Sequence, residues 1–124
     1  MLQQDPSLQI DAGDQPDSFV SGGLQIHGER WPNAYIVSVS GELGLATAQR
    51  FDKELHKARS TEAPRIILDL AALRFIDSVG LSHLLQADVA SRKESVGLFL
   101  TRGAHQVERM LELSGLQSQF RFLD

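Results

Sequence analysis

The sequence contains no cysteine, and this absence excludes several kinds of chemistry. The 124 residues can form no disulfide, offer no thiolate nucleophile and cannot build a zinc or iron–sulfur site on cysteine. Glycine-rich phosphate loops of the P-loop or Rossmann type are also absent, so we expect no bound cofactor. The four histidines, His27, His56, His83 and His105, show neither His-x-x-x-His nor Glu-x-x-His spacing, and we expect no metal site.

Long apolar runs and an excess of basic residues are missing too. No run approaches the roughly 18 apolar residues of a membrane-spanning helix, and the N-terminus lacks the positive and apolar regions of a secretory signal. With 12 basic and 16 acidic residues, the chain has no basic surface suited to DNA or RNA. We therefore expect a soluble cytoplasmic protein that inserts into no membrane and binds no nucleic acid.

The acidic charge is concentrated at the N-terminus. Residues 1–29 contain five acidic residues and no lysine or arginine, whereas the remainder is nearly balanced. Residues 1–23 are polar and show no regular apolar period. We expect them to form a disordered tail whose removal leaves thermal stability nearly unchanged, and residues 24–124 to form one domain. The alternative is that Phe19 and Val20 pack on this domain.

Apolar periodicity predicts the regular elements of that domain. The helix expected at 46–59 presents Ala48, Phe51, Leu55 and Ala58 on one face, and the helix expected at 79–91 turns Leu81, Leu84, Leu85 and Val89 inward. Strands are expected at 24–26, 34–39, 65–70 and 97–100, a further helix at 104–114 ending at Gly115, a short final strand within 116–123, and turns at 31–33 and 71–72.

The order of these elements is β-β-α-β-α-β-α-(β). Two neighbouring strands with a short connection indicate an antiparallel pair, and strands that alternate with helices indicate a parallel arrangement for the rest. We therefore predict an α/β fold with a mixed, largely parallel sheet and helices packed on it.

In such a sheet, binding sites lie at the carboxyl ends of strands, where helix N-termini present free amides. Asp77 and Ser78 occupy such a place, directly before the helix expected at 79–91. One interpretation is structural, with either residue serving as the helix cap. The other is that Ser78 is an exposed hydroxyl available for modification, since a phosphoryl group there would add about −1.5 to −2 charges at a helix N-terminus that favours them.

The stretch from Arg65 to Gln86, RIILDLAALRFIDSVGLSHLLQ, resembles the signature of the STAS family and in particular of bacterial anti-sigma factor antagonists. Further similarities lie at Ser40–Leu43, Ala46–Ala48, Gly97–Leu100 and Val107–Leu116. The resemblance covers about residues 24–122 and implies a STAS-like single domain.

The resemblance also implies a mechanism and partners. Members of this family bind an anti-sigma factor that is itself a GHKL-type serine kinase, and binding frees the sigma factor. The kinase then phosphorylates the serine after the motif's aspartate, here Ser78, which switches the protein off, and a PP2C-type phosphatase restores the active form. Besides Ser78, the resemblance implies partner contacts at Asp77, Val79, Gly80, Glu42, Gly44, Thr47 and His83. No catalytic residue is expected.

The sequence departs from the family pattern at Gly44, where relatives usually have aspartate. We expect Gly44→Asp to strengthen or broaden kinase binding by restoring an acid beside the partner surface. Two other roles remain open within the family, namely the STAS subunit of a phospholipid-trafficking ABC transporter and a stressosome-like scaffold. A serine hydrolase is disfavoured because Ile76 stands where a Gly-x-Ser-x-Gly elbow needs its first glycine. The sequence leaves the sigma factor and the oligomeric state undetermined.

Overall fold

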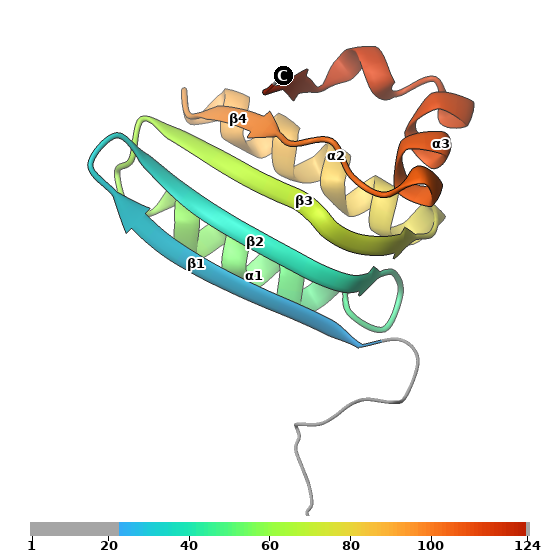
Figure 1. The fold of residues 1–124 in the computed structure, drawn as a ribbon. Coiled ribbons are helices and arrows are strands. Elements are labelled where there is room, and N and C mark those ends of the chain that lie inside the picture. Colours follow the sequence, from blue (N-terminus) through green and yellow to red (C-terminus); the bar gives the residue numbers. More distant parts are fainter. Residues whose placement is uncertain (1–22, 124) are drawn as a thin grey trace, which may run out of the picture.

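The computed structural model describes residues 23–123, and its elements follow the predicted order (Figure 1). The α/β prediction is confirmed, including the short final strand. The elements are β1 (Leu24–Trp31), β2 (Ala34–Leu43), α1 (Ala48–Arg59), β3 (Arg65–Ile76), α2 (Ser78–Lys93), β4 (Gly97–Leu100), α3 (His105–Ser114), a 3₁₀ turn (Gln117–Gln119) and β5 (Arg121–Phe122).

The five strands form one mixed sheet in the order β1-β2-β3-β4-β5. The hairpin of β1 and β2 is antiparallel, as predicted, and the other three neighbouring pairs are parallel. Because β2 and β3 run in the same direction, the segments that follow them, 44–47 and 77–78, lie at the same edge of the sheet. The topology thus brings together two loops that are about thirty residues apart in the chain.

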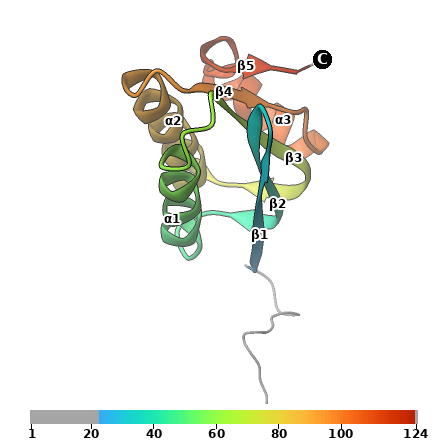
Figure 2. The same ribbon diagram turned by 90° about the vertical axis from the view of Figure 1, so that its left-hand side faces the viewer.

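Helices α1 and α2 contact each other and together cover one face of the sheet, while α3 lies apart from them (Figure 2). The predicted inner face of α1 is confirmed, since all four of its apolar residues are buried. On α2, Leu81 and Leu84 are buried as predicted, but Val89 is 45% exposed and the prediction for it is wrong. Asp88 and Ser91 take the inner positions instead, where Asp88 pairs with Arg92 at 2.8 Å and Ser91 Oγ donates to the Ala87 carbonyl.

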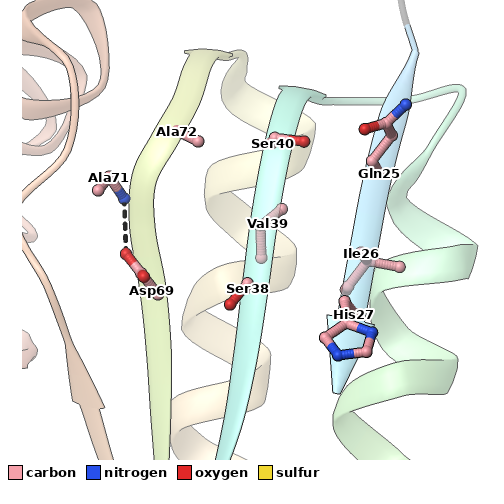
Figure 3. Close-up of a pocket in the computed structure, with 9 residues that line it drawn as sticks. All are labelled: Gln25, Ile26, His27, Ser38, Val39, Ser40, Asp69, Ala71 and Ala72. Atoms are coloured by element: carbon pink, nitrogen blue, oxygen red, sulfur yellow. Dashed lines mark hydrogen bonds between the residues drawn. The ribbon is translucent and has the colours of Figure 1, made fainter. Parts of the chain in front are cut away.

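The turn predicted at 71–72 is wrong, because β3 continues through it to Ile76. The pairing of β3 with β2 shifts register there: Ser38 is opposite Asp69, whereas Ser40 is opposite Ala72. This bulge places one extra residue in β3 and breaks the alternation of buried positions, so the pattern in the sequence resembled a strand end. Asp69 Oδ1 accepts a hydrogen bond from the Ala71 amide at 3.0 Å within the bulge (Figure 3).

The predicted tail lies almost wholly outside the described residues, and the prediction that it is disordered and dispensable stays a prediction. None of the helices within 23–123 is long and apolar enough to cross a membrane.

Candidate functional site

The Asp77–Ser78 segment is tied to the end of β2. The Asp77 amide donates to the Leu43 carbonyl at 3.2 Å, which extends the β2–β3 pairing by one residue. A Cβ built on Gly80 would lie only 2.1 Å from the same carbonyl oxygen. Gly80 is therefore needed for the close approach of the first turn of α2 to β2, and it is buried with no side chain to offer a partner.

Asp77, and not Ser78, caps α2. Asp77 has extended backbone angles, and its Oδ1 accepts a hydrogen bond from the Gly80 amide at 2.8 Å. Ser78 is the first residue of the helix and is exposed. Within the described residues, no hydrogen bond involves the Ser78 hydroxyl. The hydroxyl is thus accessible and has no structural role as a cap.

The first turn of α2 offers a favourable place for negative charge. The Asp77 side chain accepts a hydrogen bond from the Gly80 amide, and the Asp77 carbonyl accepts one from the Leu81 amide. The amides of Ser78 and Val79 have no hydrogen bond within 23–123, and no acidic residue lies in the first turn of the helix. The positive end of the helix dipole therefore favours an anion at this position, while the Asp77 carboxylate opposes it.

The loop from β2 to α1 is held by Thr47. Its Oγ1 accepts from the Gly44 amide at 3.0 Å and donates to the Glu42 carbonyl at 3.0 Å. Thr47 is only 6% exposed, and its side chain shapes the loop from inside, so the predicted partner contact at Thr47 stays a prediction that would have to run through the loop it holds. Glu42 and Gly44 are half-buried, and a Cβ built on Gly44 would lie 2.4 Å from Asp77 Oδ2, so this loop sits directly against the α2 cap.

His83 lies one turn further along α2 and joins α2 to α1. Its Nδ1 lies 2.9 Å from both carboxylate oxygens of Asp52, and its side chain is 24% exposed. An aspartate–histidine pair is also part of serine hydrolase sites, but no described hydrogen bond joins His83 to the Ser78 hydroxyl. Among residues 23–123, His83 therefore pairs with Asp52 and not with Ser78. Val79, the remaining predicted contact, is half-buried beside Ser78.

Two residues near this site were missed in the sequence. Leu45, next to Gly44, is 78% exposed, and the only signal for it in the sequence was an apolar residue in the loop between a strand and a helix. Gln106 of α3 makes two hydrogen bonds to the backbone of Ile76, and no local signal could have identified this contact across 30 residues.

A second feature lies on the sheet face opposite α1 and α2. It is an open hollow of about 260 Å³ across β1, β2 and β3 (Figure 3). None of the predicted site residues lines it. Its lining combines small and polar side chains with a few apolar ones and consists of Gln25, Ile26, His27, Ser38, Val39, Ser40, Asp69, Ala71 and Ala72.

Comparisons with known proteins agree with the fold and with the sequence signature. Residues 25–124 match the model of the STAS domain. The chain is 28% identical over 86 residues to the anti-sigma-F factor antagonist RsfB of Mycobacterium tuberculosis, which covers 69% of this chain and 70% of RsfB. The crystal structure of an anti-sigma factor antagonist from Mycobacterium paratuberculosis superposes with a TM-score of 0.74 at 27% identity, over 83% of this chain and 89% of that one. The anti-sigma factor antagonist SpoIIAA, in its unphosphorylated form, has the same fold, with a TM-score of 0.67 at 19% identity over 81% and 89%.

Proposed function

The chain belongs to the STAS domain family, and on that basis we propose that it is an anti-sigma factor antagonist. In this proposal the unphosphorylated protein binds an anti-sigma factor in the cytoplasm and releases the sigma factor. The anti-sigma factor is a GHKL-type serine kinase that phosphorylates Ser78 and thereby ends the interaction. A PP2C-type phosphatase then restores the binding form. The protein itself catalyses no reaction.

The division of roles between Asp77 and Ser78 carries this proposal. Because Asp77 makes the cap, the Ser78 hydroxyl can be modified without loss of any described hydrogen bond. A negative charge at a helix N-terminus is favoured by about 0.3–1 kcal/mol, which offsets part of the repulsion from Asp77. We therefore expect the phosphorylated protein to stay folded.

The same charge is far more costly at an interface. A like-charged or unpaired group in a desolvated contact costs several kcal/mol, enough to weaken binding about a hundredfold or more. Phosphorylation would thus change the affinity for the partner and leave the fold intact. SpoIIAA of Bacillus, a protein of this fold, is known in a phosphorylated form, with a TM-score of 0.60 at 17% identity.

The experiment is a calorimetric titration of the wild type, Ser78→Ala and Ser78→Asp against the GHKL-type kinase encoded nearest to this gene. We expect Ser78→Ala to bind like the wild type and to resist release by ATP. Ser78→Asp should bind at least tenfold more weakly, a smaller loss than phosphorylation causes, because the carboxylate carries less charge than phosphate. Ser118→Asp, an exposed serine between α3 and β5, is the control for added charge and should bind normally.

Intact-mass measurement after incubation with the kinase and ATP should show one phosphoryl group on the wild type and none on Ser78→Ala. Equal affinities for all three proteins, without phosphorylation, would argue against the switch. Such a result would favour the role of a STAS subunit in a phospholipid-trafficking ABC transporter or of a stressosome-like scaffold.

A further inference from the structure

Strand β3 extends well beyond its neighbour β4. β3 has 12 residues, but β4 has only four and pairs with Arg65–Leu68 alone. The part of β3 that leads to Asp77 and Ser78 therefore has β2 on one side and no strand on the other. Its backbone amides and carbonyls on the open side need other partners, because unpaired backbone groups are costly away from water.

Side chains from the segment after β4 supply these partners. Near the bulge, Thr101 Oγ1 accepts from the Leu70 amide at 2.9 Å and donates to Asp69 Oδ1 at 3.0 Å. At the end of the strand, a single side chain pairs both backbone groups of Ile76. Gln106 Oε1 accepts from the Ile76 amide at 2.9 Å, and Gln106 Nε2 donates to the Ile76 carbonyl at 3.1 Å. The amide of Gln106 thus replaces the missing strand two residues before Ser78.

The neighbouring residue is held from the opposite side. The Asp77 amide donates to the Leu43 carbonyl of β2, so the backbone from Ile76 to Asp77 is fastened by α3 on one side and by β2 on the other. Asp77 in turn caps α2 and begins the turn that presents Ser78. Figure 1 shows α3 beside the end of β3, where Gln106 makes this contact.

We propose that Gln106 is a positioning residue for Ser78: by pairing both backbone groups of Ile76, it couples α3 to the orientation of the phosphoacceptor hydroxyl. Without these hydrogen bonds the Ile76–Asp77 backbone gains freedom, and the hydroxyl is in the orientation required by the kinase for a smaller fraction of the time. This inference rests on the proposed phosphorylation of Ser78, but the contact of Gln106 with Ile76 can be tested without a kinase.

The test compares Gln106→Met, which keeps the length of the side chain and removes its amide, with Gln106→Asn, which keeps the amide but is too short to reach Ile76. Arg109→Met, an exposed position on the same helix, is the control. Two quantities are measured at 25 °C, where circular dichroism shows each variant folded: the kcat and KM of Ser78 phosphorylation, and amide hydrogen exchange of Ile76, Asp77 and Ser78 in the isolated protein.

We expect both Gln106 variants to lower kcat/KM for phosphorylation about tenfold and to speed exchange of the Ile76 amide by a similar factor, while Arg109→Met stays within about twofold of the wild type. Faster exchange with unchanged or faster phosphorylation would overturn the inference, since it would show a purely structural contact. Unchanged exchange would overturn it as well. If even the wild type is not phosphorylated, the proposed function fails, and exchange at Asp77 and Ser78 alone decides whether Gln106 positions the segment.

Discussion

Asp77 Oδ2 occupies the space into which a side chain on Gly44 would extend, since a Cβ built there would lie 2.4 Å from this oxygen. Other Asp77 atoms are also close, with Cγ at 2.9 Å. The loop after β2 and the cap of α2 therefore share one small space, in which only glycine fits without a shift of Asp77. This relationship connects the shape of the loop to the presentation of Ser78.

The first prediction concerns Gly44 itself. Contrary to the expectation from the sequence, we expect Gly44→Asp to lower the stability of the fold, because it displaces the Asp77 cap and places two carboxylates together. A loss of about 1–3 kcal/mol in the free energy of unfolding is expected from urea titration, and kinase binding should weaken and not strengthen. Gly44→Ala, which adds the Cβ without the charge, should lose less. Wild-type stability in both variants would show that Asp77 moves aside without penalty.

The second prediction separates the two residues at the start of α2. Asp77→Ala removes the hydrogen bond to the Gly80 amide and should lower the free energy of unfolding by about 0.5–2 kcal/mol. Ser78→Ala removes an exposed hydroxyl without a described partner and should change it by less than about 0.5 kcal/mol. Urea unfolding of the two variants in parallel provides the comparison. If Ser78→Ala lowers the free energy of unfolding as much as Asp77→Ala does, the interpretation of Ser78 as a cap is restored.

The third prediction concerns the exposed side chain of Leu45. Leu45 lies beside the Gly44–Asp77 contact, and burial of its apolar side chain against a protein partner would stabilise the complex. Leu45→Ala should weaken binding to the anti-sigma factor about fivefold to tenfold and leave the melting temperature unchanged. Leu113→Ala is a matched control, because Leu113 is 69% exposed but lies on α3. Equal effects of the two substitutions on binding would place Leu45 outside the interface.

The fourth prediction is a pH dependence that originates in Tyr35. Burial, and then the nearby Glu54 carboxylate, raise the pKa of the Tyr35 hydroxyl above its ordinary value near 10. The folded protein thus holds this proton more tightly than the unfolded chain does. The resulting stability is complete below about pH 10 and is lost as the pH rises through the folded-state pKa.

Tyr35→Phe removes this titration and should lose less stability than the wild type between neutral and strongly alkaline pH. Because the chain has one tyrosine, its tyrosinate absorbance reports the pKa of Tyr35 directly. At neutral pH the substitution removes the 3.3 Å hydrogen bond to Glu54 and should cost no more than about 1 kcal/mol. If both proteins lose the same stability between neutral and strongly alkaline pH, the prediction is wrong.

Much of the fold could be predicted because it is encoded in local patterns. The inner face of α1, the antiparallel hairpin and the end of α3 at Gly115, which has a φ of 76°, all follow from residues close together in the chain. The continuation of β3 through 71–72 could not be predicted. Asp69 at its bulge is bonded to Thr101, 32 residues away, and the interrupted alternation was indistinguishable from a turn.

The site divides in the same way. The sequence alone determined that Asp77 and Ser78 stand at the start of a helix, because apolar spacing and capping chemistry are local properties of the chain. Only the tertiary structure decided which of them is the cap, that Thr47 is buried, that Gly44 meets Asp77 and that Gln106 holds Ile76. These outcomes depend on parallel strands bringing distant loops to one edge of the sheet, where space and backbone hydrogen bonds are shared among residues that no sequence period connects.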